Sequence, residues 1–279
     1  MLERTVWGIL WAVSFLVVIY VGNLAFTLVL GLFMVLGLLE YTKLIKQQGL
    51  QPQTALMLSS ALILFFTLHQ IINRPELKVK EALLLSERAM LVTLIVFLLI
   101  SVLIELLRGE PEHHFANISG NLLGTVYIGF MFAYILLLRF LPEPSELNYL
   151  LFTQLITWAN DSMAYLIGVK FGKHHLLPRI SPKKTLEGSL GGLAGGIIAA
   201  FLLALIFKKA MGLMIFLSIV IVVVGQFGDL VESMIKRAAG AKDSGAFLPG
   251  HGGILDRFDS LLIAAPVVYY LVIYFFNAW

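Results

Sequence analysis

The chain has 279 residues, of which 59% are hydrophobic and only 13% are charged. A soluble domain carries about 25% charged residues, so the composition excludes an ordinary water-soluble globular protein and indicates a chain surrounded largely by lipid. The absence of cysteine excludes disulfides, thiolate metal sites and thiol nucleophiles. The formal net charge is only +3, and no nucleic-acid partner is expected.

Apolar runs long enough to cross a bilayer follow one another along the chain. Strand-like alternation is absent, so helices rather than a barrel are expected to satisfy the backbone in lipid. We predict an all-α, polytopic membrane protein with about nine transmembrane helices and a polar site that faces the cytoplasm. The predicted spans are residues 6–20, 24–39, 54–72, 90–106, 122–141, 149–169, 190–207, 213–227 and 261–276. They form one membrane domain over residues 1–279, in which 1–150 supply N-terminal helices and 151–279 the catalytic helices and loops.

The loop between the sixth and seventh predicted spans sets the expected topology. It contains basic residues and no acid, and such loops are usually cytoplasmic. The basic residues are Lys170, Lys173, Arg179, Lys183 and Lys184. Counting spans from this loop places residues 233–259 on the same side, with the N-terminus inside and the C-terminus outside. Residues 73–88 also carry bases yet fall outside by this count, which runs against the rule.

The sixth predicted span contains Asn160 and Asp161. A charge inside a span is costly, and such residues usually face the interior of a helix bundle and mark a functional path. A purely structural pairing of Asp161 with a nearby base is the alternative interpretation.

Residues 181–188, with the sequence SPKKTLEG, precede the seventh span. Lysines and a hydroxyl before a helix start suit phosphate, because the helix N-terminus offers free N–H groups and a positive dipole end. A basic loop at the membrane surface would show the same residues. The glycines that follow at four-residue spacing favour close helix packing in lipid, within one chain or between two copies in a homodimer.

Two helical faces present acids near the end of the chain. Asp229, Glu232, Ser233 and Lys236 share one face, and Asp256 and Asp259 share another. Carboxylate oxygens without thiolates or clustered imidazoles suit a hard cation, above all Mg²⁺. The bases around them suit phosphates, and they are Lys236, Arg237, Lys242, His251 and Arg257. Acids for a metal beside bases for phosphate indicate phosphoryl or nucleotidyl transfer. A network of salt bridges is the alternative, although such pairs stabilise little.

The stretch SMIKRAAGAKDSGAFLPGHGGILDRFD, residues 233–259, closely resembles the signature of the phosphatidate cytidylyltransferases, also called CDP-diacylglycerol synthases. Residues 160–173 and 180–188 are similar to another motif of that family. The resemblance covers about residues 160–259, and residues 1–150 are only generically similar. It implies that CMP passes from CTP to phosphatidic acid, giving CDP-diacylglycerol and pyrophosphate in phospholipid biosynthesis. It also implies a requirement for Mg²⁺ and a site at the cytoplasmic face of the plasma (inner) membrane.

The roles assigned on this basis are hypotheses. Asp229, Asp256 and Asp259 are expected to hold the metal and, with Lys236, to carry catalysis. Asp161, Glu232 and Asp243 are candidates for further ligands or for neighbours of the ligands, and a second or a monovalent cation is compatible with so many acids. The residues expected to bind substrate phosphates are Lys183, Lys184, Thr185, Ser233, Arg237, Lys242, His251 and Arg257.

Two other functions are compatible with parts of the pattern. A CTP-dependent lipid kinase acting on a polyprenol would release CDP rather than pyrophosphate, and it would need a base for a neutral hydroxyl. A secondary transporter would use Asp161 and the pair Asp256 and Asp259 as ion ligands. Transporters favour sites at the membrane midplane and internal repeats. The charges here cluster at one interface and no repeat is found, which disfavours transport.

Overall fold

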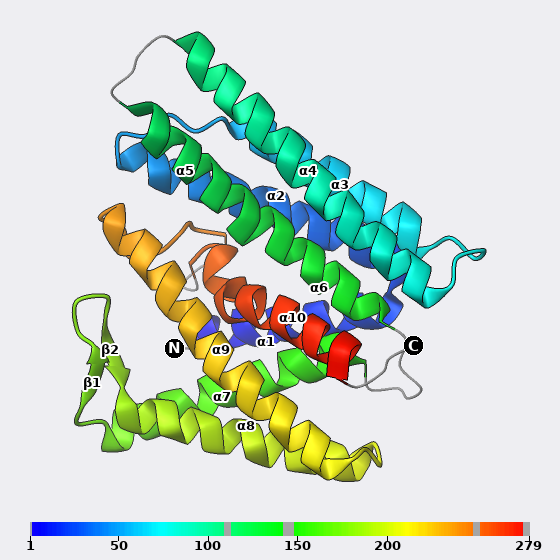
Figure 1. Ribbon diagram of the computed structural model, residues 1–279. Coiled ribbons are helices and arrows are strands. Elements are labelled where there is room, and N and C mark those ends of the chain that lie inside the picture. The colour runs from blue at the N-terminus through cyan, green and yellow to red at the C-terminus, as the bar shows by residue number, and fades with distance from the viewer. Residues whose placement is uncertain (1, 109–112, 142–147, 248–251, 276–279) are drawn as a thin grey trace. The chain divides into compact units, whose positions relative to one another are not determined.

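The computed structural model describes residues 2–108, 113–141, 148–247 and 252–275. Within these ranges the chain is almost entirely helical, with one two-stranded sheet (Figure 1). This confirms the predicted all-α class. The helices are α1 (Leu2–Val21), α2 (Asn23–Gln47), α3 (Thr54–Ile72), α4 (Val79–Arg108), α5 (His114–Gly124), the π-helix η2 (Thr125–Phe130), α6 (Met131–Phe140), α7 (Tyr149–Phe171), α8 (Leu186–Ile206), α9 (Met211–Ala238) and α10 (Leu255–Phe275).

A helix covers each predicted span. Seven helices in the described part of the chain are long and apolar enough to cross a membrane, so the predicted count of nine is not confirmed. The described apolar part of α1, Trp7–Val21, is shorter than the others. Helix α7 is not one of the seven helices because polar residues such as Gln154, Asn160 and Asp161 lower its mean hydropathy. Helices α4 and α9 extend well beyond their predicted spans. The predicted spans included apolar residues only, whereas both helices continue through turns that contain charged residues.

The described chain divides into two compact units. Unit 1 comprises residues 1–140 and 238–257, and unit 2 comprises residues 141–237 and 258–278. Residues 238–257 therefore return to the first unit, and α10 begins in unit 1 and continues in unit 2. The domain organisation expected from the sequence stays a prediction.

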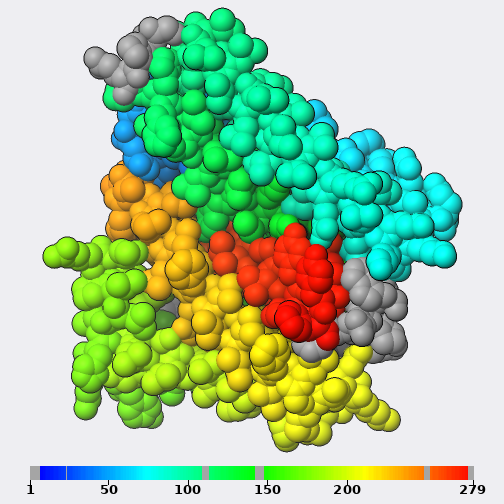
Figure 2. Space-filling view, in the orientation of Figure 1, coloured from blue at the N-terminus to red at the C-terminus, as the bar shows by residue number. Residues whose placement is uncertain are grey.

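Unit 1 is a helical bundle built around α2, α3 and the continuous helix α5–η2–α6. Side chains such as Met34, Leu64 and Phe132 are fully buried between these helices. Gly124 lets α5 approach α2, since a Cβ there would lie 2.3 Å from the Tyr41 ring. Helices α3 and α4 pack together and expose many large apolar side chains, and their outer face is visible in Figure 2. An apolar outer face of this kind is suited to contact with lipid.

Unit 2 is organised around the antiparallel pair α7 and α8. A Cβ at Gly192 would lie 2.3 Å from Oδ1 of Asn160, and one at Gly195 would lie 2.4 Å from Cγ of Met163. The glycines at four-residue spacing therefore pack α8 against α7 within one chain, as small residues do at helix interfaces in lipid.

An antiparallel hairpin of β1 (His175–Leu177) and β2 (Ser181–Thr185) joins α7 to α8 and extends beyond their ends (Figure 1). The sequence analysis treated this segment as a loop. All three residues of β1 are exposed, so the strand lacks the apolar alternation by which strands are recognised. Glu187 ties the hairpin to α8 by accepting hydrogen bonds from the backbone N–H groups of Lys173 and His174, at 3.0 and 3.2 Å.

Candidate metal and phosphate site

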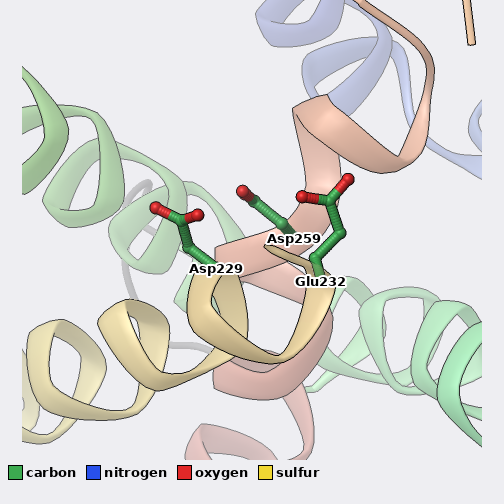
Figure 3. Close-up of side chains that lie close together, drawn as sticks. All are labelled: Asp229, Glu232 and Asp259. Carbon is green, nitrogen blue, oxygen red and sulfur yellow. The ribbon is translucent and has the colours of Figure 1, made fainter. Parts of the chain in front are cut away.

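Three acids of unit 2 meet where α9 passes α10. Asp229 and Glu232 lie on α9 and Asp259 lies on α10 (Figure 3). One carboxylate oxygen from each lies within 4.8 Å of the others. Gly228 makes this approach possible, because a Cβ there would lie 2.6 Å from the backbone oxygen of Asp259. The structure thus brings together two predicted metal ligands, Asp229 and Asp259, with the candidate Glu232.

Charged groups of both signs surround these acids. Asp161 of α7 is near enough to repel Asp259, as are Asp229 and Glu232. Lys184 forms an ion pair with Asp229, and the buried Lys236 forms one with the buried Glu232. The two ammonium groups each neutralise one carboxylate of the cluster, Lys184 at Asp229 and Lys236 at Glu232. A bound divalent cation would relieve the repulsion between the carboxylates.

A network of hydrogen bonds between α7, α8 and α9 lies next to this cluster. The Gln226 side chain donates from Nε2 to Oδ1 of Asn160, at 2.8 Å, and to the backbone oxygen of Ser189, at 3.1 Å. The Ser189 hydroxyl in turn donates to the Gln226 amide oxygen. Asn160 donates from Nδ2 to Oδ1 of Asp161, at 2.9 Å. The network therefore links α7, α8 and α9 and orients Asp161. Sequence reasoning missed Gln226, although a glutamine one turn before Asp229 in an apolar helix was the available signal.

Strand β2 of the hairpin supplies two bases, Lys183 and Lys184. Lys184 reaches Asp229 from β2, whereas Lys183 is exposed. The Thr185 hydroxyl caps α8 by accepting from the backbone N–H of Gly188, at 3.2 Å. Its predicted part in phosphate binding, like that of Lys183, stays a prediction.

Two predicted phosphate ligands on α9 also have partners in unit 2. Arg237 donates from Nε to the backbone oxygen of Ile180 in the hairpin, at 3.2 Å. The Ser233 hydroxyl lies 3.5 Å from Oδ1 of Asp229, at the limit of a weak hydrogen bond. Ser233 and Lys236 therefore stand beside the acids, and Arg237 stands against the hairpin.

Unit 1 contains the other half of the signature. Asp256 accepts three hydrogen bonds at Oδ2, from the backbone N–H and the hydroxyl of Ser244, at 2.9 and 2.8 Å, and from the N–H of Gly253, at 2.7 Å. Gly252 has φ +79°, and a Cβ there would lie 2.4 Å from Oδ2 of Asp256. The glycine at position 252 is thus explained by the Asp256 carboxylate. The role of Asp256 as a metal ligand stays a prediction.

The remaining predicted residues of the signature are placed as follows. Lys242 and Asp243 are exposed, and Arg257 is half-buried near the start of α10. His251 lies outside the described residues. The structure therefore adds no support for Asp243 as a metal ligand.

Glu40 of α2 is a further polar residue of unit 1 that the sequence analysis missed. Its buried carboxylate accepts from the backbone N–H groups of Ile254 and Leu255, at 2.9 and 3.0 Å, and the Ser244 hydroxyl lies 3.0 Å from Oε2. The predicted span ended at Leu39, one residue earlier. An acid directly after an apolar run was the signal that could have found it.

Comparison with known proteins shows where this chain belongs. The profile of the cytidylyltransferase family matches residues 2–275, which is nearly the whole chain. The chain belongs to this family. It is 44% identical over 159 residues to a phosphatidate cytidylyltransferase of Bacillus subtilis, an alignment that covers 55% of this chain and 57% of that protein. Identity is 46% over 151 residues to the protein of that name from Staphylococcus aureus, covering 53% and 55%.

A further relative, named phosphatidate cytidylyltransferase in Staphylococcus saprophyticus, is 42% identical over 161 residues, covering 57% of this chain and 60% of that protein. The chain therefore spans somewhat more than half the length of the curated relatives that it matches. For a member of the cytidylyltransferase family, the chemistry of the acidic cluster fits Mg²⁺, because its donors are carboxylate oxygens only.

Proposed function

We propose that this protein is a phosphatidate cytidylyltransferase, which transfers CMP from CTP to phosphatidic acid and releases pyrophosphate. The observation that carries the proposal is the cluster of Asp229, Glu232 and Asp259 bordered by Lys184 and Lys236. Carboxylates for a cation and ammonium groups for phosphates stand side by side there, as nucleotidyl transfer requires. The names of the relatives agree with this activity.

In the proposed reaction a phosphate oxygen of phosphatidic acid attacks the α-phosphorus of CTP. A new P–O bond forms as the bond from the α-phosphorus to the oxygen bridging to the β-phosphate breaks, and pyrophosphate leaves with that oxygen. A phosphate monoester has a second pKa of about 6, so the nucleophile is already an anion and the protein need not supply a strong base. Positioning and charge stabilisation can then supply most of the catalysis.

The residues of unit 2 have distinct parts in this proposal. Asp229, Glu232 and Asp259 would hold Mg²⁺, which would neutralise charge on the phosphate oxygens. Lys184 and Lys236 each pair with an acid of the cluster, and they would turn to phosphate oxygens when the nucleotide arrives. Asp161, oriented by Asn160, would remain next to the ligands.

The location of the site is part of the proposal. Seven of the described helices are long and apolar enough to span a membrane, and Lys184 of the basic segment 170–184 contacts the acidic cluster. A basic segment of this kind favours the cytoplasmic side of a plasma membrane, where CTP is available. Phosphatidic acid would reach the cluster from the surrounding lipid, with its headgroup at the interface.

The first test is release of pyrophosphate by the purified full-length chain in detergent with CTP, Mg²⁺ and phosphatidic acid. We expect release that depends on all three, and none when diacylglycerol replaces phosphatidic acid. Wild-type protein that releases no pyrophosphate would refute the proposal. Release of CDP with a polyprenol acceptor would instead identify a lipid kinase.

A second test addresses the metal. Asp259→Asn removes a charge from the cluster, and we expect turnover to fall at least about 100-fold, the upper range for residues that merely support a metal site. Mg²⁺ should raise the Tm of the wild type in detergent and should raise that of the variant much less, because a ligand that binds only the folded state stabilises it. Glu81→Gln is the matched control, since Glu81 is exposed on α4 and outside the cluster. Full turnover and an unchanged Mg²⁺ effect in Asp259→Asn would remove Asp259 from the site.

A further inference from the structure

We propose that Glu40 is a positioning residue, which holds Ser244 and residues 252–255 so that Asp256 is fixed at the start of α10. The effect on turnover rests on the proposed function and on the metal-ligand role that the sequence predicts for Asp256. Nothing in the signature itself indicates Glu40, which is more than 200 residues away in sequence, at a separation of 214 from Ile254.

Glu40 contacts the start of α10. The N–H groups at a helix start have no acceptor within the helix. Ile254 and Leu255 give theirs to the Glu40 carboxylate, at 2.9 and 3.0 Å. A negative charge at this end of a helix is also favoured by the helix dipole. Glu40 therefore performs from α2 the capping that a local side chain usually performs.

Ser244 connects Glu40 with Asp256. The Ser244 hydroxyl lies 3.0 Å from Oε2 of Glu40 and 2.8 Å from Oδ2 of Asp256. A hydroxyl has one hydrogen, so Ser244 can donate to only one of the two carboxylates at a time. The two acids are therefore coupled through a single shared donor. A change at Glu40 would alter the hydrogen bond that Ser244 makes with Asp256.

Two glycines, Gly245 and Gly253, lie against the Glu40 carboxylate. A Cβ at Gly253 would lie 2.4 Å from both Glu40 carboxylate oxygens, and a Cβ at Gly245 would lie 2.5 Å from one of them. These two glycines of the signature thus bring the backbone directly against the carboxylate of Glu40. This packing fixes Gly245 and Gly253 against the carboxylate of Glu40.

The test compares Glu40→Gln with Glu105→Gln in the full-length chain. Glutamine has the shape of glutamate, but its amide nitrogen cannot accept the N–H and hydroxyl donors of the loop. Glu105 is the matched control because it is a buried carboxylate of the same unit that accepts from Gln53 and Asn117, at 2.8 and 3.1 Å, rather than from the loop. Ser244→Ala is a second variant that removes only the shared hydroxyl.

The first readout is hydrogen exchange of the peptide that contains residues 252–258, which needs no activity. We expect faster exchange there in Glu40→Gln and wild-type exchange there in Glu105→Gln. The second readout is the Mg²⁺ dependence of pyrophosphate release. We expect Glu40→Gln to lower kcat or to raise the half-saturating Mg²⁺ concentration by about 10- to 100-fold, as loss of support for a metal ligand does. Ser244→Ala should show the same pattern more weakly.

The outcomes separate this inference from the proposed function. Unchanged exchange in a folded Glu40→Gln, or an equal change at this peptide in Glu105→Gln, would overturn the positioning role. The positioning role would also be overturned if the wild type is active and Glu40→Gln has the same kcat and the same Mg²⁺ requirement. If Glu40→Gln does not fold, wild-type exchange and kinetics in Ser244→Ala would overturn the role instead. A wild type without pyrophosphate release, with faster exchange in Glu40→Gln, would refute the proposed function and leave the positioning role standing.

Discussion

Lys184 and Asp229 form an ion pair that joins the end of β2 to α9. The sequence predicts Lys184 as a phosphate ligand and Asp229 as a metal ligand. In the structure the two side chains neutralise each other. Both are partly exposed, at 29% and 31% of their side-chain surface, so the pair can open without a large cost. Each side chain would be released for its own ligand when metal and nucleotide arrive together.

Substituting Lys184 should therefore move two quantities in opposite directions. Lys184→Met frees Asp229 from its partner, and we expect Mg²⁺ to bind up to about fivefold more tightly, corresponding to about 1 kcal/mol for a partly exposed pair. Turnover should fall, because the phosphates lose a cation. Thermal shifts with Mg²⁺ and pyrophosphate release measure the two effects. Lys183→Met is the comparison: its side chain is exposed, and we expect no tightening of Mg²⁺ binding.

A second prediction separates backbone strain from contact with Asp256. Gly252 and Gly240 both have positive φ, at +79° and +67°, so alanine at either costs about 1–2 kcal/mol. Only Gly252 would place a Cβ against Asp256, because nothing lies within 4 Å of the corresponding position at Gly240. We expect Gly252→Ala to lose turnover per folded molecule and Gly240→Ala to keep it. Equal turnover in the two variants would show that the Asp256 contact is unimportant.

A third prediction concerns the packing of α8 on α7. Gly192→Ala places a methyl group 2.3 Å from Oδ1 of Asn160, and such overpacking costs about 1–3 kcal/mol. Gly212→Ala is the control in α9, where the added methyl meets nothing within 4 Å and helix propensity favours alanine by about 0.5–1 kcal/mol. Thermal unfolding in detergent should give a lower Tm for the first and an unchanged or higher Tm for the second. An unchanged Tm in Gly192→Ala would contradict the close packing.

Local sequence determined the helical class of this protein and most of its helix positions. Runs of apolar residues predict helices in lipid without tertiary information, because the backbone must be satisfied within each segment. Spacing of three and four also predicted that Asp229 and Glu232 share a helix face, as Figure 3 shows. The same reasoning missed the hairpin at residues 175–185, since the fully exposed strand β1 carries no apolar alternation.

Tertiary structure decided which side chains meet. Asp259 joins Asp229 because Gly228 lets α9 approach α10, and no local pattern encodes a distance between two helices. Glu40 meets Ser244 and the start of α10 from a separation of more than 200 residues, and the signature alone gives no sign of it. The sequence by itself thus determined the helices and the chemical types available to the site. The contacts across helices, which depend on packing rather than on spacing, determined how those groups are paired.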